Sequence, residues 1–231
     1  MIKEIIKSPV FGVTVTLIAF EIGLFLQNRT KSYVVNPMLI ATSLIIIMLL
    51  TFKIPYQNYN EGGKYISFLL GPATVALAIP LYKNIDLILK YRMAIFVGIL
   101  CGSVAGILSA ALIASFLGAD KTIALSLAPK SVTTPIAIEI SNILKGYPSL
   151  TSAAVIITGI IGAMMGPEVL KIAGINNKIA KGIAIGTAAH GLGTSRAVQE
   201  GEIEGAMSGL AIGLAGIITS LIIPFIVKMI L

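Results

Sequence analysis

The chain has 231 residues, of which 56% are hydrophobic and only 12% are charged, whereas an average soluble domain carries about 25% charged residues. With a mean hydropathy of +0.97, it lacks the polar residues that a soluble fold of this size needs for its surface. The net charge of +7 comes from Lys and Arg dispersed over short loops, which is typical of membrane topology signals and not of a nucleic-acid surface. These features exclude a soluble or nucleic-acid-binding domain and predict an all-α integral membrane protein.

Eight stretches approach the length of about 20 mostly apolar residues that a transmembrane helix needs. The basic residues before the first stretch resemble a signal peptide, but no small-residue cleavage site follows, so we expect a retained first span. The single cysteine, Cys101, lies inside an apolar run, so we expect no disulfide framework, metal site or cofactor. In chain order the stretches are Ser8–Leu26, Pro37–Phe52, Lys64–Tyr82, Met93–Leu117, Lys121–Ile143, Leu150–Ile172, Ile179–Ala197 and Ile203–Leu231.

The third, fifth and seventh stretches are interrupted by proline or clustered glycine. Proline removes a backbone donor and clashes with the preceding turn, and glycine weakens a helix. In hydrocarbon the freed backbone groups need partners, so such breaks survive only against protein or a watery cavity. They therefore predict a polar interior. The interrupting residues are Gly71, Pro72 and Pro80, then Pro129 and Pro135, then Gly186, Gly191 and Gly193.

The two halves of the chain resemble each other, which predicts a repeat of residues 1–118 in residues 119–231. Ile18–Leu26 matches Ile136–Leu144 at five of nine positions. Each half then has the same order of elements, and repeats with broken helices at corresponding positions are typical of secondary transporters. We expect the repeats to be inverted. Outside the two polar motifs, nine Lys and Arg lie on the side of the membrane that holds the termini and six on the other side. The division is the same for eight crossings and for six crossings with re-entrant third and seventh stretches. Both termini are therefore expected in the cytoplasm, and the number of crossings stays open.

Lys130 and Arg196 are the strongest candidates for a binding site. Each lies in an otherwise apolar stretch, where a central charge costs at least about 3 kcal/mol. Each also lies at a predicted helix break, where the N-termini of half-helices favour an anion. We predict that they bind a carboxylate, although an interfacial position for either is the alternative. The neighbouring hydroxyls predicted to contact the substrate are Ser131, Thr133, Thr134, Thr194 and Ser195.

Three further residues are candidates for coupling transport to protons. His190 is the one histidine of the chain, and its ordinary pKa is close to neutrality. Glu21 and Glu139 occupy equivalent positions of the predicted repeat and could neutralise a cation or accept a proton. A structural role for His190 and an interfacial position for Glu21 are the alternatives. No motif of the sequence indicates an enzyme.

The two polar motifs resemble those of the LrgB/CidB family of bacterial membrane proteins. They are Ser126-Leu-Ala-Pro-Lys-Ser-Val-Thr-Thr-Pro-Ile-Ala137 and Gly186-Thr-Ala-Ala-His-Gly-Leu-Gly-Thr-Ser-Arg-Ala197, and the resemblance extends over the whole chain. It implies a multi-pass protein of the bacterial inner membrane with a small LrgA/CidA-type membrane partner.

The resemblance implies two kinds of function. One is transport of small monocarboxylates such as pyruvate, glycolate and glycerate, and the other is holin/antiholin-like regulation of murein hydrolases and autolysis. We expect transport, because paired cations at broken helices suit a carboxylate, and a homo-oligomer is expected because the chain is small for a carrier. The holin/antiholin-like regulator is the alternative.

Overall fold

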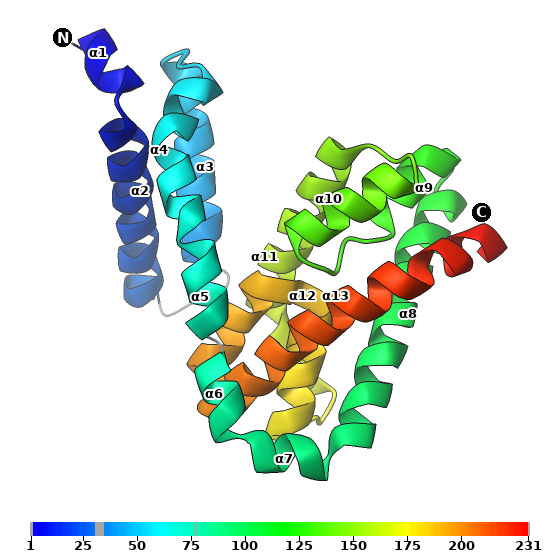
Figure 1. Ribbon diagram of the computed structural model, residues 1–231. Coiled ribbons are helices and arrows are strands. Elements are labelled where there is room, and N and C mark those ends of the chain that lie inside the picture. The colour runs from blue at the N-terminus through cyan, green and yellow to red at the C-terminus, as the bar shows by residue number, and fades with distance from the viewer. Residues whose placement is uncertain (1, 31–34, 77, 231) are drawn as a thin grey trace. The chain divides into compact units, whose positions relative to one another are not determined.

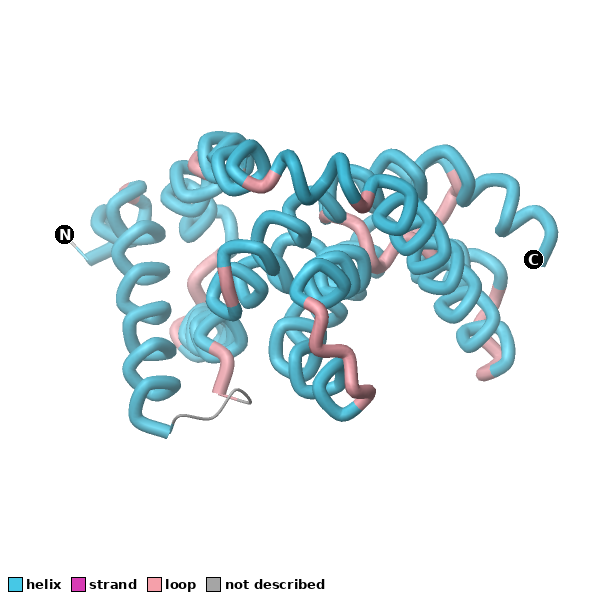
Figure 2. Tube along the Cα trace, turned by 90° about the horizontal axis from the view of Figure 1, so that it is seen from below, coloured by secondary structure: helices cyan, strands magenta, loops and turns pink. Residues whose placement is uncertain are grey.

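The structure, a computed structural model, describes residues 2–30, 35–76 and 78–230, and every regular element among them is a helix (Figures 1 and 2). The predicted all-helical class is thus confirmed. The helices are α1 (Ile2–Lys7), α2 (Pro9–Thr30), α3 (Pro37–Thr51), α4 (Tyr56–Phe68), α5 (Leu70–Ala76), α6 (Ala78–Lys83), α7 (Ile85–Lys90), α8 (Arg92–Phe116), α9 (Lys121–Leu127), α10 (Thr134–Ile143), α11 (Pro148–Ile172), α12 (Lys178–Glu200) and α13 (Glu202–Ile230).

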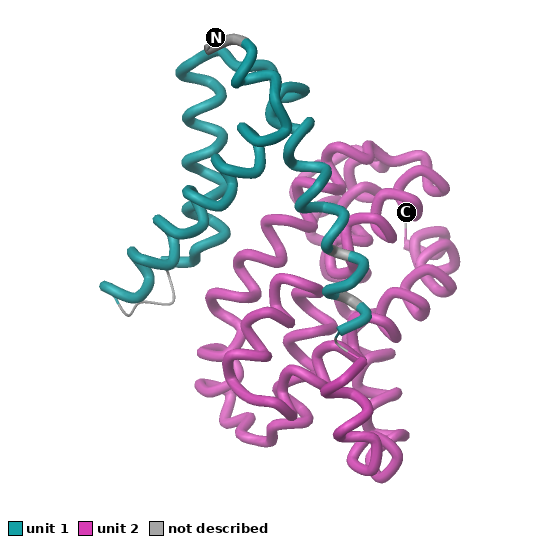
Figure 3. The backbone as a smooth tube through the Cα atoms, turned by 60° about the vertical axis from the view of Figure 1, so that its left-hand side comes forward, with its two compact units in different colours: residues 1–76 teal, residues 77–231 magenta. Residues whose placement is uncertain are grey.

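The chain forms two compact units, Met1–Ala76 and Leu77–Leu231 (Figure 3). In the first unit, α2 packs against α3 and α4. Gly12 and Gly62 allow α2 and α4 to approach closely, since a Cβ built on Gly12 would lie 2.9 Å from Gly62 Cα. A hydrogen bond of 2.8 Å between the Thr16 and Tyr59 hydroxyls joins the same two helices.

In the second unit, α13 packs along α8 through a buried apolar seam that includes Ile95, Ile99, Met207 and Ala211. The apolar residues of α8 on this seam recur every four positions, which places them on one face of the helix. Gly98, Gly102 and Gly106 lie on an adjoining face of α8, which borders a cavity.

Five helical stretches are long and apolar enough to cross a membrane: Pro9–Thr30, Tyr56–Lys83, Arg92–Phe116, Pro148–Ile172 and Glu202–Ile230. They correspond to the first, third, fourth, sixth and eighth stretches expected from the sequence. The second is a shorter apolar helix, α3. The fifth and seventh differ most from plain spans, because the chain breaks within each of them.

The seventh stretch, α12, is a helical hairpin. Ala189 (φ −129°, ψ 15°) and His190 (φ 42°, ψ −134°) are non-helical and divide α12 into two arms, 178–188 and 191–200. A Cβ built on Gly193 would lie 3.0 Å from the carbonyl oxygen of Ile185, although residues eight apart in a straight helix are separated by about 12 Å. The second arm therefore folds back on the first.

Contacts with α13 show the same reversal of direction. Gly182 packs against Met207, and a Cβ built on Gly186 would lie 2.8 Å from Ser208 Cα, so the first arm runs parallel to α13. In the second arm Thr194 contacts Ser208 and Val198 contacts Gly205, so this arm is antiparallel to α13. Arms of 11 and 10 residues are about 17 and 15 Å long, too short to cross a hydrocarbon core of about 30 Å. For this stretch the geometry follows the re-entrant alternative.

The fifth stretch is broken between α9 and α10, where residues 128–133 form turns. After α10 the chain returns to the end of α9, because the Tyr147 amide donates to Ser126 Oγ at 2.7 Å. With 7 and 10 residues, α9 and α10 are about 10 and 15 Å long, so neither spans the bilayer alone. Pro129 and Pro135 thus mark a true interruption.

The predicted inverted repeat stays a prediction. The two compact units divide after Ala76, whereas the predicted repeats divide after Gly118. Within each half the order of elements matches the expectation only in part, since α2 is continuous while the matching stretch is broken into α9 and α10.

Candidate functional site

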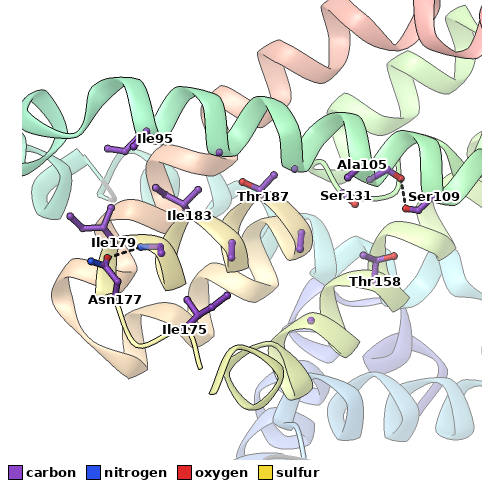
Figure 4. Close-up of a pocket in the computed structure, with 18 of the residues that line it drawn as sticks. Ile95, Ala105, Ser109, Ser131, Thr158, Ile175, Asn177, Ile179, Ile183 and Thr187 are labelled. Atoms are coloured by element: carbon purple, nitrogen blue, oxygen red, sulfur yellow. Dashed lines mark hydrogen bonds between the residues drawn. The ribbon is translucent and has the colours of Figure 1, made fainter. Parts of the chain in front are cut away.

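The second unit encloses a cavity of about 1020 Å³ between α8, α11, the first arm of α12 and the turn that follows α9 (Figure 4). Both polar motifs contribute to its wall, Lys130 and Ser131 from the first and Thr187 and Ala188 from the second. Most of the remaining wall is apolar or glycine. Its other polar residues are Tyr91, Ser109, Thr158 and Asn177.

Lys130 gives the cavity its charge. Among the described residues that line the cavity, it is the one Lys or Arg, and none is Asp or Glu. Its Nζ donates to Ser131 Oγ at 3.2 Å, within the turn that precedes α10. A half-buried ammonium without a neighbouring carboxylate attracts an anion, and the cavity therefore suits a ligand with one negative charge.

Thr133 and Thr134 lie at the start of α10 and not in the wall of the cavity. Thr133 is the N-cap residue, but its side chain makes no capping hydrogen bond. The first amides of α10 give this end of the helix a partial positive charge. These two threonines therefore follow the Lys130 turn in the chain but do not line the cavity.

Two glycines of α8 bring the motifs together at the cavity. A Cβ built on Gly102 would lie 2.9 Å from Thr187 Cγ2, and one on Gly106 would lie 3.3 Å from Ser131 Oγ. Small residues one turn apart allow such close packing against a helix in a membrane. Since the two glycines are one turn apart, Thr187 and Ser131 contact α8 at neighbouring levels, about 6 Å apart along its axis.

His190 forms the tip of the α12 hairpin, contacts α11 and does not line the cavity. Its Nε2 lies 2.9 Å from the carbonyl oxygen of Val155. The ring fits against Gly159, where a Cβ would lie 2.6 Å from His190 Cε1. The contacts of His190 are those of a residue that fixes the hairpin to α11, and its predicted role in proton coupling stays a prediction.

The two hydroxyl residues of the second motif that were predicted to contact the substrate also have partners outside the cavity. Thr194 Oγ1 donates to the carbonyl oxygen of His190 at 2.9 Å and lies 2.7 Å from Ser208 Oγ. Ser195 is exposed, and its hydroxyl donates to the carbonyl oxygen of Leu192 at 2.8 Å. Neither lines the cavity.

Arg196 lies on the second arm of α12 and does not line the cavity. Its side chain is 13% exposed and pairs with Glu200 one turn later, at 2.5 Å. It also donates to Gln199 at 3.4 Å. Joint binding of one anion by Arg196 and Lys130 stays a prediction, and the geometry favours Lys130.

The acidic candidates occupy different surroundings. Glu21 and Glu139 are both exposed in their units. Glu204, in the first turn of α13, is 5% exposed, and no hydrogen-bond partner of its Oε2 is present among the described residues. Glu204 was not among the acidic candidates predicted from the sequence.

Thr187 and Thr158 are two of the cavity residues that were not predicted as site residues from the sequence. For Thr187 a signal exists, since Ala180, Ile183, Ala184 and Thr187 follow the helical spacing i, i+3, i+4 and i+7 and all line the cavity. For Thr158, which lies in the apolar central part of α11, the sequence offers no comparable signal.

Comparison with known proteins identifies the family. The model of the LrgB-like family matches residues 16–229. Proteins named "Antiholin-like protein LrgB" from Bacillus cereus (strain B4264) and from Bacillus anthracis (strain CDC 684 / NRRL 3495) are each 39% identical to the chain over 218 residues, covering 94% of it and 95% of the relative. No solved structure matches. The family and the apolar helices together indicate a multi-pass membrane protein, and the chain belongs to the LrgB-like family.

Proposed function

We propose that the protein is a membrane carrier for small monocarboxylate anions of the pyruvate, glycolate and glycerate class. The observation that carries the proposal is Lys130, the one basic side chain in the described wall of a cavity that contains no described acid. The cavity lies where the chain is interrupted twice, in the turn after α9 and near the tip of α12. Discontinuous helices around a polar site are typical of secondary transporters.

The residues of the site have distinct roles in this proposal. The Lys130 ammonium binds the carboxylate, and Ser131 holds the ammonium in place through their hydrogen bond. The start of α10 adds a favourable dipole, because a helix N-terminus stabilises negative charge. Apolar residues of α8, α11 and α12 form the rest of the wall and accommodate the carbon chain.

Uptake of radiolabelled pyruvate and glycolate into proteoliposomes tests the proposal. A hydrogen bond to a charged group contributes about 1.5–3 kcal/mol, so we expect Lys130→Gln to lower uptake at subsaturating substrate at least about tenfold. Lys171→Gln is the matched control, because Lys171 is exposed at the end of α11 and does not line the cavity. Undiminished uptake by folded Lys130→Gln would refute the carboxylate site.

Proton coupling is a separate part of the proposal, with His190, Glu21 and Glu139 as its candidates. An imposed pH gradient that drives pyruvate accumulation above equilibrium in wild-type vesicles would support coupling. Each candidate is then replaced by its neutral counterpart, and loss of accumulation with retained exchange identifies the coupling residue.

The second candidate function is antiholin-like regulation of murein hydrolases with an LrgA/CidA-type partner, and the names of the relatives favour it. In that case the chain would co-purify with the partner, and its loss would change autolysis rates. Lys130→Gln would leave both unaffected. Absence of uptake by folded wild-type protein, with and without the partner, would favour this function over transport.

A further inference from the structure

Thr187 and Ser103 are exceptions among the helical hydroxyl residues that the structure describes, and of these two Thr187 is the one that lines the cavity. Seven Ser and Thr hydroxyls on the described helices donate to the carbonyl oxygen four residues earlier, at 2.7–3.1 Å. Thr187 is only 6% exposed, yet its Oγ1 has no hydrogen-bond partner among the described residues. Buried polar groups are nearly always hydrogen-bonded, so this one needs an explanation.

Thr187 packs against α8. Its methyl group contacts Gly102, where a Cβ would lie 2.9 Å away. The same side chain lines the cavity (Figure 4). Rotation about χ1 to another staggered position moves the hydroxyl without moving the backbone. Thr187 therefore has an unused donor and acceptor at the cavity wall.

Two other hydroxyls of the cavity wall already have hydrogen-bond partners. Ser109 donates to the carbonyl oxygen of Gly106 at 3.2 Å, and Ser131 accepts from Lys130. Thr187 and Ser131 contact α8 one turn apart, a separation along the helix axis of about 6 Å. A small acid whose carboxylate is bound by Lys130 can thus reach Thr187 with a neighbouring oxygen.

We propose that Thr187 is a specificity-determining residue, whose hydroxyl binds the 2-oxo or 2-hydroxy oxygen of the substrate while Lys130 binds the carboxylate. The inference rests on the carrier function proposed above. In this inference, the Thr187 hydroxyl enables the carrier to discriminate against acids without an oxygen at carbon 2, such as propionate. A site that hydrogen-bonds a substrate oxygen rejects an analogue without it, because the polar group of the site is then left unpaired.

Competition in proteoliposomes tests this assignment. Uptake of radiolabelled pyruvate is measured with unlabelled pyruvate or propionate, which have the same number of carbon atoms, as competitors. We expect the wild type to prefer pyruvate about tenfold or more and Thr187→Val, which keeps the shape of the side chain, to bring the two acids near parity. Thr187→Ser and the control Ser109→Ala should retain the preference.

The outcomes separate this inference from the proposed function. A preference that survives in Thr187→Val, or that is lost in Thr158→Val instead, overturns the role of Thr187 and leaves the carrier function standing. Wild-type protein that takes up no pyruvate overturns both. If Thr187→Val does not fold, Thr187→Ser and Thr187→Ala still differ only in the hydroxyl, and equal preferences in these two variants overturn the proposal.

Discussion

Thr151 hydrogen-bonds to the end of α9, just before the turn that carries Lys130. Replacement of its hydroxyl should lower both thermal stability and pyruvate uptake. Its Oγ1 lies 2.9 Å from the carbonyl oxygen of Ser126, 2.8 Å from Ser141 Oγ and 3.1 Å from the carbonyl oxygen of Tyr147. Ser126, Ser141 and Thr151 are all 0% exposed. The cluster therefore ties the end of α9, the end of α10 and the start of α11 together.

Thr151→Val replaces this hydroxyl by a methyl group of similar size. Leaving buried polar partners unsatisfied costs about 1–3 kcal/mol, and about 2 kcal/mol corresponds to a fall in Tm of about 4–8 °C for a protein of this length. We expect pyruvate uptake per folded protein to fall as well, because the turn that carries Lys130 loses an anchor.

Thermal unfolding in detergent and vesicle uptake measure the two effects of Thr151→Val. Ser152→Ala is the matched control, because the neighbouring hydroxyl of Ser152 donates to the carbonyl oxygen of Pro148 within its own helix. A change in Tm for Thr151→Val no larger than for Ser152→Ala would show that the buried cluster does not hold this part of the fold together.

Two further substitutions test α12. Gly159→Ala should lower Tm by an amount equivalent to about 1–3 kcal/mol, because its Cβ would lie 2.6 Å from His190 Cε1. Gly213→Ala is the control, since its Cβ would meet no atom within 4 Å, and its Tm should not fall. Arg196→Gln should cost about 1 kcal/mol of stability through loss of the pair with Glu200 and keep most pyruvate uptake per folded protein. Loss of that uptake would place Arg196 in the site.

The interruptions of the fifth and seventh stretches could be predicted from the sequence because they are local. Pro129 and Pro135 cannot continue a helix, whatever their surroundings. The direction of the chain after a break is not a local property. At Ala189 and His190 the chain reverses because Gly182 and Gly186 allow the first arm to pack closely on α13, and these contacts cannot be inferred from spacing alone.

The predicted site combined two polar motifs, and the structure directs their residues to different surroundings. Lys130 and Ser131 face the cavity, whereas Arg196 lies on the returning arm of α12 with Glu200. The i, i+4 spacing of Arg196 and Glu200 favours an ion pair and is visible in the sequence. That spacing alone does not decide between an ion pair and a ligand site, because a cation in an apolar stretch also suggests a ligand.

The hairpin in α12 makes a prediction about membrane topology that needs no transport assay. Both ends of a hairpin with arms of about 17 and 15 Å lie on the same side of the membrane. Because Cys101 is the one cysteine of the chain, Cys101→Ser gives a cysteine-free background for the single variants Lys178→Cys and Glu200→Cys. Both positions are exposed.

A membrane-impermeant maleimide added to oriented vesicles should label both cysteines from the same face. If α12 were a straight helix of 23 residues, it would be about 35 Å long and its ends would be labelled from opposite faces. That result would refute the hairpin. It would also remove the reason for placing Thr187 and Arg196 on different arms, since the contacts that separate them depend on the reversal at His190.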